Sequence, residues 1–185
     1  ARPRRIVELG FAAFYLNRCN RSGIMSTGGV IGGLDQTGKW KIDARYNPTE
    51  LIRRIERLAA LREKIRICRL DAIEFLRTDI LQEKDRSRYF IYLDPPYYVK
   101  GSRLYLNYYE PKDHAALARF LRRIKHVNWL VTYDNTPEIR ELYEWREITD
   151  FQLQYSAASA KQGSEIMIPS PGLSLPIERL RVQSA

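Results

Sequence analysis

Apolar and polar positions follow a helical rhythm at the start of the chain and lose it soon afterwards. Ile6, Leu9, Ala13 and Leu16 recur at the spacing of one helix face, which predicts an amphipathic helix over residues 4–16. Residues 19–47 hold six of the ten glycines and show no such rhythm. We therefore expect a loop-rich segment with a strand or two there, in which Gly28–Gly33 forms a hairpin.

A second helix is predicted by its start signals. Asn47 is a typical N-cap residue, Pro48 suits the first helical position, and Glu50 stands where a capping-box partner would. Apolar residues continue at helical spacing as far as Leu58. These signals predict a helix from Pro48 to about Glu63.

Beyond this helix, short apolar runs alternate with amphipathic stretches. The pattern predicts strands over residues 65–69, 89–93, 127–133, 147–155 and 165–168, and helices over 71–77, 111–125 and 136–143. Such alternation is typical of an α/β fold with a parallel or mixed sheet covered by helices. Residues 171–185 show no periodicity and are predicted to form a tail.

Composition narrows the class of protein. Lys and Arg number 31 against 22 Asp and Glu, and the net charge of +9 favours a nucleic acid as partner. Cys19 and Cys68 make no disulfide framework, while His114 and His126, both predicted at the surface, are too few for a zinc site. No apolar run is long enough to cross a bilayer. We expect a soluble, reduced, intracellular protein that acts without a metal or a membrane.

The tetrapeptide Asp94-Pro95-Pro96-Tyr97 is the clearest chemical signal, because it directly follows an apolar strand. In open α/β sheets, ligands bind outside the carboxyl ends of the strands. The prolines have no amide hydrogen, so this corner offers carbonyls, a carboxylate and an aromatic face, which suit a planar ring bearing an exocyclic amine. The alternative is a strand ended by a proline turn, with Asp94 capping a helix.

This tetrapeptide resembles the catalytic motif of amino methyltransferases that use S-adenosylmethionine. The upstream residues 13–18 (Ala-Phe-Tyr-Leu-Asn-Arg) and 20–23 (Asn-Arg-Ser-Gly) are similar to the start of the target-recognition region in the Dam-like, alpha-group adenine-specific DNA methyltransferases. The order of the motifs is also theirs, and the resemblance covers about residues 13–168. It implies a Rossmann-like S-adenosylmethionine-dependent methyltransferase sheet with a target-recognition insert. It also implies a cytoplasmic, bacterial or phage-encoded enzyme, which we expect to be monomeric.

The resemblance further implies a mechanism. An adenine would be flipped out of double-stranded DNA, Asp94 and the Pro95 carbonyl would accept hydrogen bonds from its N6 amine, and Tyr97 beside Pro96 would stack on the base. Asp71, with the amide of Ala72, would contact the adenine of S-adenosylmethionine, and Asp94 would border that cofactor. A plain helix N-cap is the alternative for Asp71.

Cations and amides of the glycine-rich segment would face the DNA. The candidates for reading bases or holding phosphates are Arg18, Asn20, Arg21, Lys39, Lys41 and Arg45, with Asn17, Gln36 and Trp40 interleaved. A merely solvated charged face is the alternative. We expect residues 1–17 and 48–170 to form the catalytic domain and residues 18–47 the recognition insert.

The sequence departs from the family pattern because it lacks a Gly-Gly-Lys segment and the glycine loop that follows this segment in the family. The Phe-x-Gly-x-Gly loop of the first strand, which holds the methionine part of the cofactor, is not among these residues. We therefore expect the first strands to be absent from this chain, with two βα units (about 60 residues) supplied by a leading segment. The alternatives to DNA adenine methylation are a methyltransferase acting on cytosine or RNA, and a degenerate or truncated DNA-binding protein.

Overall fold

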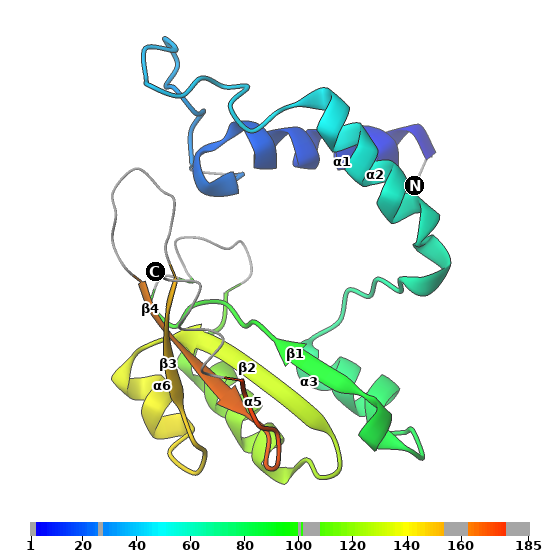
Figure 1. Ribbon diagram of the computed structural model, residues 1–185, viewed down its shortest axis with the longest axis vertical. Coiled ribbons are helices and arrows are strands. Elements are labelled where there is room, and N and C mark those ends of the chain that lie inside the picture. Colours follow the sequence, from blue (N-terminus) through cyan, green and yellow to red (C-terminus); the bar gives the residue numbers. More distant parts are fainter. Residues whose placement is uncertain (1–2, 26–27, 100, 102–107, 154–162, 177–185) are drawn as a thin grey trace. The chain divides into compact units, whose positions relative to one another are not determined.

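A computed structural model describes residues 3–25, 28–99, 101, 108–153 and 163–176. The chain divides into two compact units, Ala1–Arg69 and Leu70–Ala185, and each is described here by itself (Figure 1). The first is called the N-terminal unit and the second the sheet unit. No helix of the described residues is long and apolar enough to cross a membrane.

Two helices frame the N-terminal unit. Helix α1 spans Pro3–Cys19 and α2 spans Pro48–Ala60, with short 3-10 turns at Arg21–Gly23 (η1) and Arg62–Lys64 (η2). The predicted N-cap of α2 is confirmed, because the Asn47 side chain accepts a hydrogen bond from the backbone amide of Glu50. The Glu50 carboxylate binds Arg53 and Arg54 one turn further on.

The segment between these helices is built from turns. In place of the predicted hairpin, the described residues form one isolated antiparallel bridge, Asn20 to Val30. The Gln36 side chain holds the loop together by donating to the carbonyls of Ile31 and Gly33 and accepting from the amide of Ile42. Because one amide side chain replaces the ladder of hydrogen bonds in a hairpin, no strand pair is needed to order these residues.

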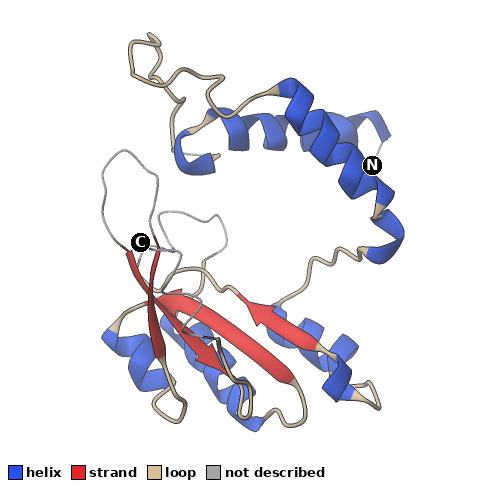
Figure 2. Ribbon diagram, viewed as in Figure 1, coloured by secondary structure: helices blue, strands red, loops and turns tan. Residues whose placement is uncertain are grey.

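The sheet unit has four strands in the order β1-β2-β4-β3 (Figure 2). Strand β1 is Phe90–Leu93, β2 is Asn128–Asp134, β3 is Thr149–Leu153 and β4 is Gly163–Pro169. β1 pairs with β2 in parallel, whereas β4 is antiparallel to both β2 and β3. The mixed α/β fold is therefore confirmed, and the four strands lie close to their predicted ranges. Residues 154 and 155, the end of the strand predicted over 147–155, lie outside the described residues.

Helices cover one face of this sheet. They are α3 (Ala72–Phe75), which continues as a π-helical turn η3 (Leu76–Ile80), then α5 (Pro111–Arg123) and α6 (Pro137–Leu142), while η4 (Arg86–Arg88) precedes β1. The buried core joins α5 and α6 to alternate residues of β2 and β4, including Leu117, Leu121, Val131, Ile139, Ile166 and Ile168. Phe90 and Tyr92 of β1 are more than half exposed. The helices and core thus fix β1 and β2 as a platform whose carboxyl ends lie at the same edge of the sheet, with β2 three residues longer.

The strand predicted over residues 65–69 does not form. This segment is irregular, and Ile67 is 91% exposed. An apolar run becomes a strand only when a neighbouring strand satisfies its amides and carbonyls. No described strand pairs with this one, so the prediction was wrong despite the favourable residues. Of the predicted tail, residues 171–176 are irregular and the rest lies outside the described residues.

His114 was also wrongly predicted, because it is fully buried whereas His126 is exposed, as expected. It lies on the inner face of α5 with Leu117 and Leu121, at the spacing that places a residue in the core. Its Nδ1 atom lies 2.9 Å from the Tyr133 hydroxyl. Burial lowers the pKa of His114, because the charged imidazolium would lose its hydration there.

This burial predicts a histidine-specific loss of stability in acid. Below about pH 6.5 the unfolded chain takes up a proton on His114 that the folded chain resists. The free energy of unfolding should therefore fall with decreasing pH, by at most about 1.4 kcal/mol per pH unit from this group. Urea unfolding of His114→Asn between pH 7.5 and 5.5 should give a shallower fall than the wild type, and His126→Asn should not. An equal fall in both variants would contradict this assignment.

Candidate active site

The tetrapeptide Asp94–Tyr97 lies where β1 ends, beside the carboxyl end of β2. Leu93 is in register with Val131, so the residues that follow the two strands meet at one edge of the sheet. Asp94 is exposed, and Pro95, Pro96 and Tyr97 are partly buried. This corner is therefore open to a ligand rather than sealed in the interior, as the chemistry suggested by its residues requires.

Asp94 is oriented by a neighbour on β2. The buried Thr132 hydroxyl donates to Asp94 Oδ1 at 3.2 Å, and the Tyr92 hydroxyl lies 2.9 Å from the same Thr132 oxygen. Because Thr132 has one hydroxyl proton, its bond to Asp94 leaves it to accept a proton from Tyr92. One carboxylate oxygen is thus anchored, whereas the other accepts no hydrogen bond from the residues that the structure describes.

The loop after the tetrapeptide is held by Asp134, the last residue of β2. Its Oδ1 accepts from the amide of Tyr98 at 2.8 Å, and its Oδ2 accepts from the amide of Val99 at 3.2 Å. The sequence analysis missed this residue. The available signal was an acid at the end of a strand, the same position that Asp94 holds after β1.

A further acid holds the tetrapeptide from β4. The Tyr97 hydroxyl donates to Glu165 Oε1 at 2.9 Å, and Glu165 is only 7% exposed. The two residues are 68 positions apart, so no local pattern in the sequence could have paired them. Asp94, Tyr97 and the following amides are therefore each bound by a different side chain of β2 or β4.

Aromatic rings pack beneath this loop around His114. The ring centroids of Tyr98, Tyr109 and Tyr133 lie 5.1, 5.3 and 5.5 Å from that of His114. Burial raises the pKa of Tyr133 and of Tyr109, so these phenols stay neutral at ordinary pH. The aromatic cluster therefore supports the corner with packed, uncharged side chains.

Asp71 serves as the N-cap of α3. Its Oδ1 accepts from the amides of Ile73 at 2.9 Å and Glu74 at 3.2 Å. The capping interpretation of Asp71 thus describes its observed contacts. Ala72 occupies the first helical position, where a backbone amide has no acceptor within the helix.

The net positive charge of the protein comes entirely from the N-terminal unit. Residues 1–69 contain 15 Lys and Arg against 6 Asp and Glu, whereas residues 70–185 contain 16 of each. A polyanion such as DNA is therefore attracted to the first unit far more strongly than to the second.

The predicted DNA-contacting residues divide into bound and available ones. Asn20 is 6% exposed and donates to the Ile24 carbonyl, and Arg45 and Lys41 donate to the carbonyls of Asn17 and Gln36. Asn20 is therefore buried and holds the loop through this hydrogen bond. The expectation that it faces the DNA at the surface is corrected accordingly.

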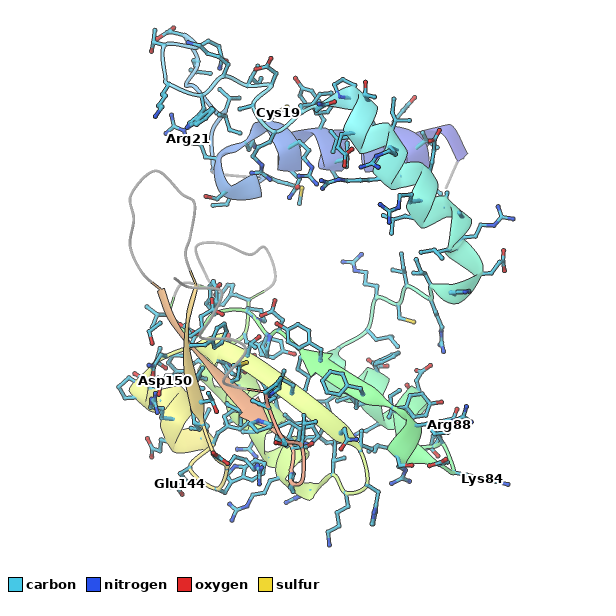
Figure 3. All side chains as sticks on the ribbon, viewed as in Figure 1. Cys19, Arg21, Lys84, Arg88, Glu144 and Asp150 are labelled. Atoms are coloured by element: carbon cyan, nitrogen blue, oxygen red, sulfur yellow. The ribbon has the colours of Figure 1, made fainter. Side chains whose placement is uncertain are left out.

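The more accessible cations lie beside an exposed tryptophan and at the turn after α1. Lys39 lies over the ring of Trp40, which is 64% exposed, and Arg21 is exposed at the turn after α1 (Figure 3). Arg18 is partly buried and lies over the ring of Phe14. Arg21 and Lys39 are consequently the strongest candidates for phosphate or base contact.

One cavity of the sheet unit does not suit a DNA substrate. A cavity of about 430 Å³ is lined by Glu138, Glu141 and Glu144 together with Arg122, and its carboxylates would repel a phosphodiester. Among the described residues, no three His, Cys, Asp or Glu side chains gather as metal ligands would.

Comparison with known proteins gives one family. The model of the D12 class N6 adenine-specific DNA methyltransferases matches residues 12–157, which include the end of α1, the loop segment, the tetrapeptide and β2. No curated protein sequence matches the chain.

The contacts of Asp134 predict how the loop depends on it. Asp134→Ala removes the acceptor of both amides, so hydrogen exchange at Tyr98 and Val99 should accelerate about 10-fold or more, since a hydrogen bond to a charged group contributes about 1.5–3 kcal/mol. Asp134→Asn keeps one acceptor oxygen and should protect one amide. Exchange rates measured by NMR check this, and unchanged rates in the alanine variant would contradict the anchoring role.

Proposed function

The chain belongs to the D12 class N6 adenine-specific DNA methyltransferase family, and we propose that its Asp94–Tyr97 corner methylates the N6 amine of an adenine flipped out of duplex DNA. The observation that supports this site is the exposed Asp94 carboxylate, held by Thr132 through one oxygen at the carboxyl end of β1. The family accounts for DNA adenine methylation as the reaction. The flipping of the base and the residues that act on it are our proposal.

The Asp94 Oδ2 atom and the Pro95 carbonyl each accept a hydrogen bond from one N–H of the amine. These bonds draw the nitrogen out of conjugation with the ring, and its lone pair becomes available for attack. Tyr97 stacks on the base and keeps it in line. A base within the duplex cannot reach this corner, because its amine is committed to pairing, so extrusion precedes the reaction.

S-adenosylmethionine fits the charge of the corner, since a sulfonium cation is favoured beside the exposed Asp94 carboxylate. When bound, this cofactor would supply the electrophilic methyl group and leave as a neutral thioether, and the methylated amine would release one proton to water. We propose that the amide of Ala72 and the carboxylate of Asp71 hold its adenine. The capping bonds of Asp71 fit a fixed acceptor, because they orient the carboxylate beside the Ala72 amide.

The N-terminal unit holds the DNA. Its net charge of +9 suits a phosphate backbone, and Arg21 and Lys39 contribute the accessible cations, with Arg18, Lys41 and Arg45 around them. The exposed Trp40 ring adds an apolar contact for sugar or base. The family resemblance leads us to propose that the enzyme works in the cytoplasm of a bacterial or phage-infected cell.

Loss of the Asp94 carboxylate should abolish the reaction. Asp94→Ala removes the acceptor that orients the amine, so methyl transfer to DNA should fall at least 100-fold, as it does when one preorganised polar group is removed. Asp94→Asn should retain more activity than alanine, because its carbonyl still accepts one hydrogen bond. Asp85→Ala is the matched control, an acid before η4 whose activity should equal that of the wild type.

The assay measures labelled methyl groups incorporated from S-adenosylmethionine into DNA, with the modified base identified by sequencing. Methylcytosine as the product would exclude adenine as the target, and equal rates for Asp94→Ala and the wild type would exclude the proposed site. DNA binding without cofactor uptake would instead favour the degenerate DNA-binding alternative.

The charge distribution predicts which variants change the salt dependence of binding. Each phosphate contact contributes about 0.9 to the slope of log K against log salt. Arg21→Ala should lower this slope by about one, whereas Arg88→Ala, at the amino end of β1 (Figure 3), should leave it unchanged. Fluorescence anisotropy of labelled duplex DNA at several salt concentrations measures both slopes. Equal slopes for Arg21→Ala and the wild type would remove Arg21 from the interface.

A further inference from the structure

We propose that Glu165 is a positioning residue that fixes the Tyr97 ring before a target base arrives. The inference rests on the proposed function, in which Tyr97 is the stacking wall of the base site. It concerns a residue of β4 that no motif of the sequence includes, and it specifies how the wall is held in place. The contact that carries it is the hydrogen bond from the Tyr97 hydroxyl to Glu165 Oε1, at 2.9 Å.

The sheet register brings Glu165 to the corner. Asp134 at the end of β2 is the direct partner of Glu165 near the start of β4 in the antiparallel ladder. Asp134 binds the amides of Tyr98 and Val99, and Glu165 binds the side chain of Tyr97. Three consecutive residues of the corner are therefore held by two acids that face each other across one strand pair.

Packing alone does not account for this pair of acids. Like charges directly opposite each other in a ladder destabilise a sheet, and a nearly buried carboxylate costs further free energy unless donors satisfy it. Here each carboxylate receives hydrogens from the same short segment of the corner. The unfavourable pairing of Asp134 with Glu165 therefore occurs where both carboxylates order the proposed base site.

Anchoring the hydroxyl fixes the orientation of the ring. A tyrosine held only at its Cβ can rotate, and a base that binds must then immobilise it. A hydrogen bond at the far end of the ring removes that freedom in advance, so the loss of entropy does not count against binding of the base. The bond should therefore act mainly on KM for DNA, and little on the affinity for S-adenosylmethionine.

The experiment is a double-mutant cycle on the full chain. It measures steady-state methylation of duplex DNA that contains the methylated site identified by sequencing. Glu165→Ala and Tyr97→Phe should each raise KM for DNA about 3- to 10-fold, and the double variant should raise it no further, because both changes break one bond. Glu165→Gln should restore most of the affinity, since its carbonyl also accepts from the hydroxyl. Glu144→Ala, an exposed glutamate of the same unit, is the control and should match the wild type (Figure 3).

Urea unfolding of each variant separates positioning from stability. If Glu165→Ala unfolds, Tyr97→Phe still tests the proposal, because it removes only the hydroxyl. Additive rises in KM in the cycle, or an unchanged KM in Tyr97→Phe, would overturn the role of Glu165 while leaving the methyltransferase intact. A wild-type chain that transfers no methyl group to DNA would instead refute the proposed function itself, and the inference with it.

Discussion

The parallel pairing of β1 with β2 is the constraint on which the candidate site depends. It places the ends of both strands at one edge, so that Asp94 after β1 lies within reach of Thr132 and the following loop within reach of Asp134. A corner of two prolines has few amides of its own to bond with. Side chains from neighbouring strands therefore hold its shape, together with the backbone bond from the Gly101 amide to the Tyr97 carbonyl.

Hydrogen bonding divides the acids of the corner into two anchors and one accessible carboxylate. Asp134 and Glu165 are engaged with the backbone and the tyrosine of the corner, and Glu165 is nearly buried. Asp94 is exposed and accepts one bond from Thr132. A carboxylate that is oriented but still accessible is what an exocyclic amine needs, and this separates Asp94 from the acids around it.

Charge and chemistry are distributed between the two units. The N-terminal unit carries the whole net charge, and the sheet unit is neutral overall. Long-range attraction of a polyanion needs many cations with little geometric precision, whereas amine chemistry needs a few groups fixed to a rigid sheet. The turn-rich loop of the first unit, ordered by the Gln36 side chain, presents Lys39 and Trp40 accordingly.

The sequence by itself determined the helix start at Asn47, the strand that ends at Asp94 and the amphipathic face of α5, because capping, proline geometry and periodicity act between residues close in the chain. Tertiary structure alone decided that Glu165 binds Tyr97 and that residues 65–69 form no strand. Strand pairing joins residues that are far apart in the chain. No local pattern can therefore predict the register that places Glu165 beside the corner, or whether a strand-like segment finds a partner strand.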